Sequence, residues 1–216
     1  MKTPNGLVAG LLALSFLAGD RAKADSRMFT DRGAWTQACN GLANIDFEGI
    51  APLGGYTLFG REGLTIAGIT FVGHASSSYV LWVVDPAFYP AYYDWGSGAV
   101  LLGSSPESGP ANICVDLNRG FTCVGTDVMS FNSPSAGYGD TIAVALSTGE
   151  TFSVTTCHYP NRAFIGFTSD VPITSMSFSP TGTQSWPELD NFAFGDIRVV
   201  ASPRTGAVVE PPRGSK

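Results

Sequence analysis

Basic residues are scarce in this sequence, and this scarcity narrows the range of partners. The chain has 12 Lys and Arg against 18 Asp and Glu, a formal net charge of −6. Residues 1–24 hold three of the basic side chains and one of the acidic ones, so the remainder carries −8, with Lys216 as its one lysine. An acidic surface without a basic cluster repels phosphate backbones and anionic lipid headgroups. We therefore expect neither a nucleic-acid partner nor attraction to anionic membranes.

The sequence also lacks the common motifs of catalysis. It contains no G-x-S-x-G nucleophile elbow, no Walker loop and no glycine fingerprint for dinucleotides. Its two histidines, His74 and His158, are not spaced as metal ligands, and we expect both to be structural or surface residues. A polysaccharide hydrolase needs two acids facing one cleft, and it is the less favoured alternative to a protein without catalytic activity.

The first residues have the pattern of an export signal. Lys2 precedes an uncharged run from Leu7 to Gly19, and the small residues Ala22 and Ala24 follow at a position suited to cleavage. This run of 13 residues is shorter than the roughly 20 that span a bilayer. We predict a signal peptide over 1–24, a single domain over 25–200, and a disordered tail rich in Ser, Pro, Arg and Gly over 201–216. The mature protein is then secreted, with no membrane insertion.

Short strands dominate the predicted secondary structure. Charged residues make up only 14% of the chain, while 26 Gly and 14 Pro supply many turns. Residues 141–146 alternate between polar or small and apolar side chains, the period of a strand with one buried face. About a dozen such segments without intervening helices favour packed antiparallel sheets. We predict an all-β fold, an antiparallel, jelly-roll-like β-sandwich.

One short helix near the N-terminus is expected beside these strands. Residues 30–42 place Trp35, Ala38, Cys39 and Leu42 on one helical face. Thr30 or Asp31 is suited to cap its first turn.

Four cysteines in an exported chain indicate two disulfides. Three pairings are open by arithmetic. Residues 114–123 have the pattern of a hairpin turning at Asn118-Arg119, which places Cys114 opposite Cys123. The predicted bridges are therefore Cys114–Cys123 and Cys39–Cys157. Metal ligation by the thiolates is disfavoured because no Cys-x-x-Cys pair exists.

Three acidic residues on predicted strands form a candidate calcium site. Asp46 and Glu48 are two positions apart and share one face of a strand, and Asp190 lies in the last strand. If the first and last strands are neighbours, these carboxylates meet and suit Ca²⁺, which prefers hard oxygen ligands. In the alternative interpretation they face solvent or bind nearby backbone amides.

Aromatic residues gather in one predicted loop, residues 85–98. Aromatic rings stack on the faces of sugar rings while carboxylates accept hydroxyl hydrogen bonds. The candidate carbohydrate-binding residues are Asp85, Tyr89, Tyr92, Tyr93, Asp94 and Trp95. In the alternative, the loop folds back and buries its rings at one end of the sandwich.

Several segments together resemble bacterial exported proteins of the PEP-CTERM group. After the helix beginning at Asp31-Arg32, they are NIDFEG (44–49), LTIAGITF (64–71), VVDPAF (83–88), WGSGAVLLG (95–103), STGETF (147–152), FIGFTSD (164–170) and LDNFAFG (189–195). The resemblance implies a secreted β-sandwich without known catalysis that acts at the cell surface or in an exopolysaccharide matrix. Such proteins end in Pro-Glu-Pro, a membrane-spanning helix and a basic cluster, whereas here only four residues follow Glu210-Pro211-Pro212. We therefore expect free secretion, or a truncated sequence.

These features favour a non-catalytic extracellular module that contacts carbohydrate or exopolysaccharide matrix, with structural calcium. The alternative is a structural surface or matrix protein that contacts other proteins and binds no glycan. The sequence does not indicate an oligomeric state.

Overall fold

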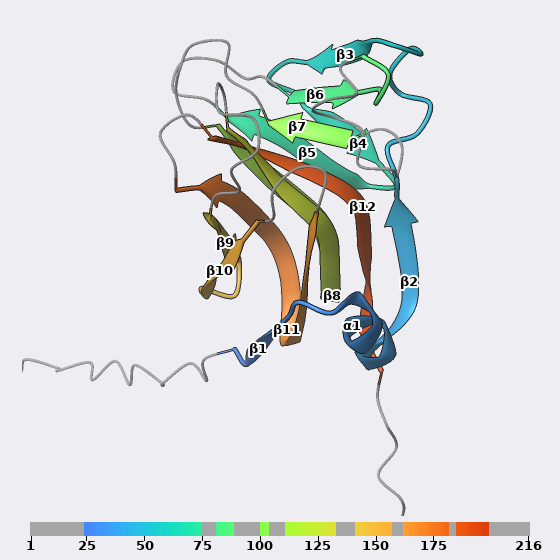
Figure 1. Ribbon diagram of the computed structural model, residues 1–216. Helices are drawn as coiled ribbons and strands as arrows, with labels where there is room; N and C mark the ends of the chain where they lie inside the picture. The colour runs from blue at the N-terminus through green and yellow to red at the C-terminus, as the bar shows by residue number, and fades with distance from the viewer. Residues whose placement is uncertain are drawn as a thin grey trace, which may run out of the picture.

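The computed structural model describes residues 24–74, 81–88, 100–103, 111–132, 141–156, 162–181 and 185–198. It is drawn in Figure 1. The strands are β1 (Ser26–Phe29), β2 (Cys39–Ile45), β3 (Tyr56–Phe59), β4 (Leu64–Ile66), β5 (Ile69–His74), β6 (Leu81–Val84), β7 (Val100–Gly103), β8 (Asn112–Asn132), β9 (Thr141–Leu146), β10 (Thr151–Thr155), β11 (Ala163–Pro180) and β12 (Ser185–Ile197), and the helix is α1 (Arg32–Ala38). The predicted tail and all but the last residue of the predicted signal peptide lie outside the described residues.

Two long strands, β8 and β11, change partners along their length and so join two antiparallel layers. The first half of β8 pairs with β5 and with the second half of β11, which continues to β9 and β10. The second half of β8 pairs with the first half of β11 and with β12, and β12 continues to β2 and to β7, β6 and β3. Figure 1 shows these strands curving through the molecule. The all-β, antiparallel, jelly-roll-like β-sandwich with one short helix is confirmed.

The core lies between the layers, because one side of each strand is apolar. Phe71, Phe167, Phe178 and Phe192 are completely buried and belong to one continuous apolar cluster. The rings of Phe71 and Phe192 meet edge to face with centroids 5.2 Å apart, an arrangement that favours aromatic pairs.

The predicted hairpin at Asn118-Arg119 is wrong, because β8 continues through it. Asn118 and Gly120 have φ of 58° and 76°, and the carboxylate of Asp116 accepts a 2.8 Å hydrogen bond from the Asn118 amide. The facing strand shifts register between Thr168 and Ile173. The left-handed residues therefore form a bulge that bends the strand toward the second layer instead of reversing it.

Both predicted disulfide pairings are also wrong, for the same reason. On a continuous strand that rises about 3.3 Å per residue, Cys114 and Cys123 are far apart. Cys123 instead forms a disulfide with Cys39, and Cys114 is a free cysteine. Cys157 lies outside the described residues. Two disulfides were expected, and the described residues contain one, with a pairing that was not predicted.

Helix α1 begins where predicted and ends four residues earlier than predicted. Asp31 caps it, since its carboxylate accepts a 2.6 Å hydrogen bond from the Ala34 amide. Cys39 is already extended, and the chain continues as β2, which pairs with β12. Trp35 anchors the helix to the sheet: it is completely buried, and its Nε1 donates to the Phe167 carbonyl at 3.1 Å. No helix among the described residues is long and apolar enough to cross a bilayer.

Candidate functional site

An open groove of about 530 Å³ lies on the outer face of the layer that contains β5, the first half of β8, the second half of β11, β9 and β10. It crosses β5, β8, β11 and β9. Its lining consists of small polar, small apolar and a few larger side chains: Thr70, Val72, His74, Cys114, Val115, Asp116, Ala145, Leu146, Ser147, Thr174, Ser175, Met176 and Ser177. The groove forms because these strands send apolar side chains into the core and shorter, mostly polar ones outward.

A row of polar side chains crosses the strands at one end of the groove. Thr65, Thr70, Asp116 and Ser175 are in register across β4, β5, β8 and β11, and we call them the polar row. Side chains directly opposite each other on neighbouring strands lie about 5 Å apart at Cβ. The hydroxyls of Thr65 and Thr70 are hydrogen-bonded at 2.9 Å. The polar row therefore offers closely spaced donors and acceptors to a ligand lying across the strands.

Asp116 supplies the one carboxylate of the groove lining. It is exposed, and its Oδ1 accepts the hydrogen bond from the Asn118 amide in the bulge. No hydrogen bond or ion pair to Oδ2 is formed by the residues that the structure describes. Local backbone geometry therefore fixes the carboxylate while one oxygen remains available for a ligand.

The next row across the strands is less polar. Val72, Cys114, Ser177 and Ala145 are in register across β5, β8, β11 and β9, and all four are half-buried. Burial raises the pKa of the Cys114 thiol, because the thiolate loses hydration there. Val72, Cys114 and Ala145 therefore give the groove a mostly apolar strip beside the polar row, interrupted by the hydroxyl of Ser177.

The structure gives Asp85 a local structural role. Its carboxylate accepts hydrogen bonds from the Gly54 amide at 3.0 Å and the Ala87 amide at 2.9 Å. This ties the loop after β6 to the loop before β3. The other predicted carbohydrate-binding residues, Tyr89, Tyr92, Tyr93, Asp94 and Trp95, lie outside the described residues.

A group of aromatic rings lies next to Asp85; Phe88 belongs to the predicted aromatic loop, whereas Tyr56 and Trp82 were not predicted as site residues. The centroid of the Tyr56 ring lies 4.6 Å from that of Trp82 and 4.9 Å from that of Phe88. The Tyr56 side chain is 39% exposed. On the same strand, Leu58 is 54% exposed. These side chains form an apolar face on β3 and β6.

The three predicted calcium ligands do not form a metal-binding group. Asp46 and Glu48 are exposed in the loop after β2 and line a small hollow of about 250 Å³ with Ala67, whereas Asp190 is fully buried. The Asp46 carboxylate accepts a 3.2 Å hydrogen bond from the Glu48 amide. Across the described ranges, no three His, Cys, Asp or Glu side chains are grouped to hold a metal ion. Calcium binding by this protein stays a prediction.

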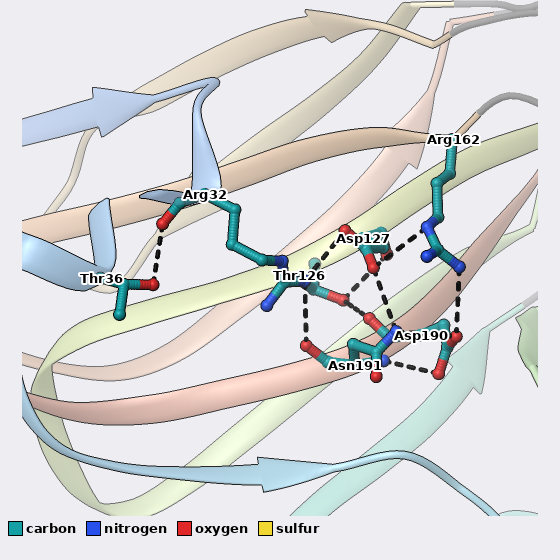
Figure 2. Close-up of polar contacts among 7 residues, drawn as sticks. All are labelled: Arg32, Thr36, Thr126, Asp127, Arg162, Asp190 and Asn191. Carbon is teal, nitrogen blue, oxygen red and sulfur yellow. Dashed lines mark hydrogen bonds and ion pairs between the residues drawn. The ribbon is translucent and has the colours of Figure 1, made fainter. Parts of the chain in front are cut away.

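Asp190 belongs instead to a network of compensated charges, shown in Figure 2. Arg32 and Arg162 approach Asp127 from two sides, with N–O distances of 2.9 and 3.3 Å. Arg162 also lies 3.9 Å from Asp190. The Asn191 side-chain amide donates to Asp127 at 3.1 Å and to Asp190 at 3.0 Å. This network ties the first turn of α1 and the start of β11 to β8 and β12, which indicates a structural role.

Sequence reasoning missed the groove residues, although a weak signal existed. Small polar residues recur at every second position in Ser175, Ser177 and Ser179, and Thr70 and His74 flank Val72 in the same way. This alternation shows that one face is wet. It does not show that the strands are neighbours, which depends on the pairing of β5 and β11 with β8.

Comparisons with known proteins give remote similarities only. No protein-family model matches the chain, and no curated protein matches it. A variant of a family 29 carbohydrate-binding module is 13% identical, over 69% of this chain and 97% of that one, with a TM-score of 0.36. A second variant, in complex with mannohexaose, is 14% identical, over 65% and 92%, with a TM-score of 0.37.

A two-module fragment (CBM22-1 and GH10) of a Clostridium thermocellum xylanase, in complex with xylohexaose, is also similar. It is 9% identical over 71% of this chain and 28% of that one, with a TM-score of 0.37. At such identities and scores, these comparisons assign neither a family nor a ligand to this chain.

Proposed function

We propose that this protein is a secreted, non-catalytic module that binds a polysaccharide in the groove over β5, β8, β11 and β9. The observation that carries the proposal is the groove itself, about 530 Å³ in volume, open to solvent and lined by residues of four neighbouring strands. Its polar row offers hydroxyls and a carboxylate at regular spacing, and its neighbouring row offers an apolar strip. Polysaccharides present the complementary surface, with hydroxyls at the ring edges and C–H groups on the ring faces.

The lining of the groove supports binding without hydrolysis. Glycoside hydrolysis ordinarily requires two carboxyl groups on either side of the scissile bond. Asp116 is the one carboxylate among the residues that line this groove. The buried carboxylates Asp127 and Asp190 are occupied by arginine and amide partners.

An extracellular location is part of this proposal. It is supported by the signal-like residues 1–24, by the resemblance to PEP-CTERM proteins, and by the disulfide between Cys39 and Cys123. Disulfides persist in oxidising compartments and are rare in the reducing cytosol.

A structural matrix protein that contacts other proteins is the second candidate. One observation favours it: the exposed apolar side chains on and before β3, namely Leu53 at 91%, Leu58 at 54% and Tyr56 at 39% exposure. Exposed apolar side chains that gather on one face mark protein contacts more often than isolated ones.

The test is to fill the groove. Ser177 lies half-buried in its middle, between Cys114 and Ala145, so Ser177→Trp places a large ring where the ligand would lie. We expect affinity for the best ligand in a panel of soluble glucans, mannans, xylans and chitosan to fall at least about tenfold, because the ring replaces direct contacts. Affinity gel electrophoresis and calorimetry measure the change.

Ser153→Trp is the matched control. Ser153 is exposed on β10, in the same layer, and does not line the groove. We expect this variant to bind as the unmodified protein does, with both variants folded by circular dichroism. Equal binding by the Ser177→Trp variant would remove the groove as the site. Absence of binding by the unmodified protein to every polymer would favour the matrix-protein alternative.

A further inference from the structure

We propose that the groove selects neutral and amino-sugar polysaccharides over uronate or sulfated ones, and that Asp116 is the residue that sets this preference. The inference rests on the proposed function and adds the chemical class of the ligand. It follows from the charges of the groove and from the position of one carboxylate.

Among the described residues that line the groove, His74 is the one basic side chain, and no lysine or arginine is there to receive an acidic sugar. Asp116 contributes a negative charge. The arginine nearest to Asp116 in the sequence is Arg119, which does not line the groove. Its guanidinium lies 4.7 Å from the centre of the Phe121 ring. Recognition of carboxylate or sulfate groups usually depends on Arg or Lys donors.

Asp116 lies where a bound chain would pass. It is in the middle of the polar row, directly opposite Thr70 on one side and Ser175 on the other. Its Oδ1 is held by the Asn118 amide, so the carboxylate is oriented before the ligand arrives. The other oxygen can accept a hydrogen bond from a sugar hydroxyl or, more strongly, from the ammonium group of an amino sugar.

The same carboxylate repels a ligand carboxylate. Two negative charges about 5 Å apart in a solvated groove lower affinity by about three- to tenfold for each such contact. The remainder of the chain after residue 24 has a formal charge of −8, which adds a long-range repulsion that salt screens. Hydroxyl-rich neutral chains experience neither penalty.

The experiment compares six polymers: a β-glucan, a mannan, a xylan, chitosan, polygalacturonate and alginate. We expect the protein to bind at least one of the first four at least about tenfold more tightly than either acidic polymer in low salt, because the charge penalties combine. In Asp116→Asn, the amide oxygen can still accept from the Asn118 backbone while the charge is removed. We expect this variant to reduce the ratio of these two affinities by about three- to tenfold, because it should bind chitosan more weakly and acidic polymers more strongly.

Asp196→Asn is the matched control, because Asp196 is an exposed carboxylate on β12 that accepts from the Thr122 hydroxyl and lies outside the groove. This variant removes the same charge away from the groove, so the ratio of the affinities for the preferred and the acidic polymers should change less than about twofold. Preferred binding of polygalacturonate or alginate would overturn the inference and leave polysaccharide binding intact. So would an equal effect of the two variants. Absence of binding to all six polymers would overturn the proposed function as well.

Discussion

At the scale of single residues, the groove depends on short side chains. Ser175 and Ser177 leave room above β11, and Thr70 supplies a hydroxyl without covering Asp116. Short side chains bring a ligand close to the sheet and lose little rotamer entropy when they bind it. The floor of such a groove is rigid, because every second residue of the same strands is packed in the core.

Cys114 provides a test of the groove that requires no ligand assay. Its thiol is half-buried, and burial raises its pKa, so its thiolate fraction at pH 8 is smaller than that of an unfolded cysteine. We expect iodoacetamide to alkylate Cys114 several-fold more slowly in the native protein than in urea. A bound polysaccharide should slow the reaction further, since Cys114 lines the groove.

Peptide mass spectrometry measures this rate at Cys114 separately from that at Cys157. Raising the pH should accelerate both reactions, and the native rate should keep rising at pH values where the rate in urea has levelled off, because the pKa of the folded thiol is the higher one. Rapid labelling at pH 7, unaffected by any polysaccharide that binds, would show that the groove is not where the ligand lies.

Residue roles were predictable where the partner is near in sequence. A cap of α1 by Thr30 or Asp31 was predicted, and Asp31 provides it, because an N-cap binds an amide three residues away. Asp85 and Asp190 were assigned to ligands, whereas the structure gives each a partner close in sequence, Ala87 and Asn191, together with a distant one, Gly54 and Arg162. The distant partners lie 20 residues or more away in the chain, and sequence spacing does not reveal such neighbours.

At the scale of elements, the packing of α1 depends on glycines in two neighbouring strands. Gly125 in β8 and Gly166 in β11 lie under the ring of Trp35. A Cβ at position 166 would lie 2.7 Å from the Trp35 ring, closer than two carbons approach. The absence of side chains at these positions lets the helix lie directly on the sheet.

Gly166→Ala should therefore destabilise the protein by about 1 to 3 kcal/mol, the usual range for overpacking a well-filled site. Urea unfolding followed by tryptophan fluorescence measures the loss. The matched control is Gly60→Ala, because a Cβ there meets no atom within 4 Å. We expect it to be neutral or slightly stabilising, since alanine reduces the entropy of the unfolded chain. Equal stabilities for the two variants would contradict the close packing of Trp35.

The existence of most strands was predictable from alternation, but their ends and partners were not. Residues 63–73 have the pattern of one strand, whereas Ala67 and Gly68, with φ of 51° and 79°, turn the chain between β4 and β5. The reverse error occurred at Asn118, where a residue typical of turns forms a bulge. In both cases a glycine and a nearby non-glycine residue adopt left-handed φ, and the pairing partner decides whether the chain reverses or bends.

At the scale of the whole molecule, the disulfide joins β2 to β8. In the sheet, these two strands are connected only through β12, which lies between them. Cys39 follows α1 at the start of β2, and Cys123 lies on the second half of β8. Both strands pair with β12, so the bridge reaches across this central strand. Cys39 and Cys123 are almost completely buried beside Trp35, in an apolar cluster separate from the main core. The bridge therefore fixes the helix and β2 against the rest of the sandwich.

Removing this bridge should lower the free energy of unfolding by about 4 kcal/mol in the Cys39→Ser/Cys123→Ser variant. The cysteines are 84 residues apart, and opening a loop of this length releases chain entropy of about that size in the unfolded state. The urea midpoint should fall while the m-value rises, because the unfolded chain exposes more surface without the bridge. Cys114→Ser is the control, and it should cost less than about 1 kcal/mol, since this thiol is half-buried and unbridged. A double variant as stable as the control, or a peptide map that joins Cys39 to a different cysteine, would contradict this arrangement of the layers.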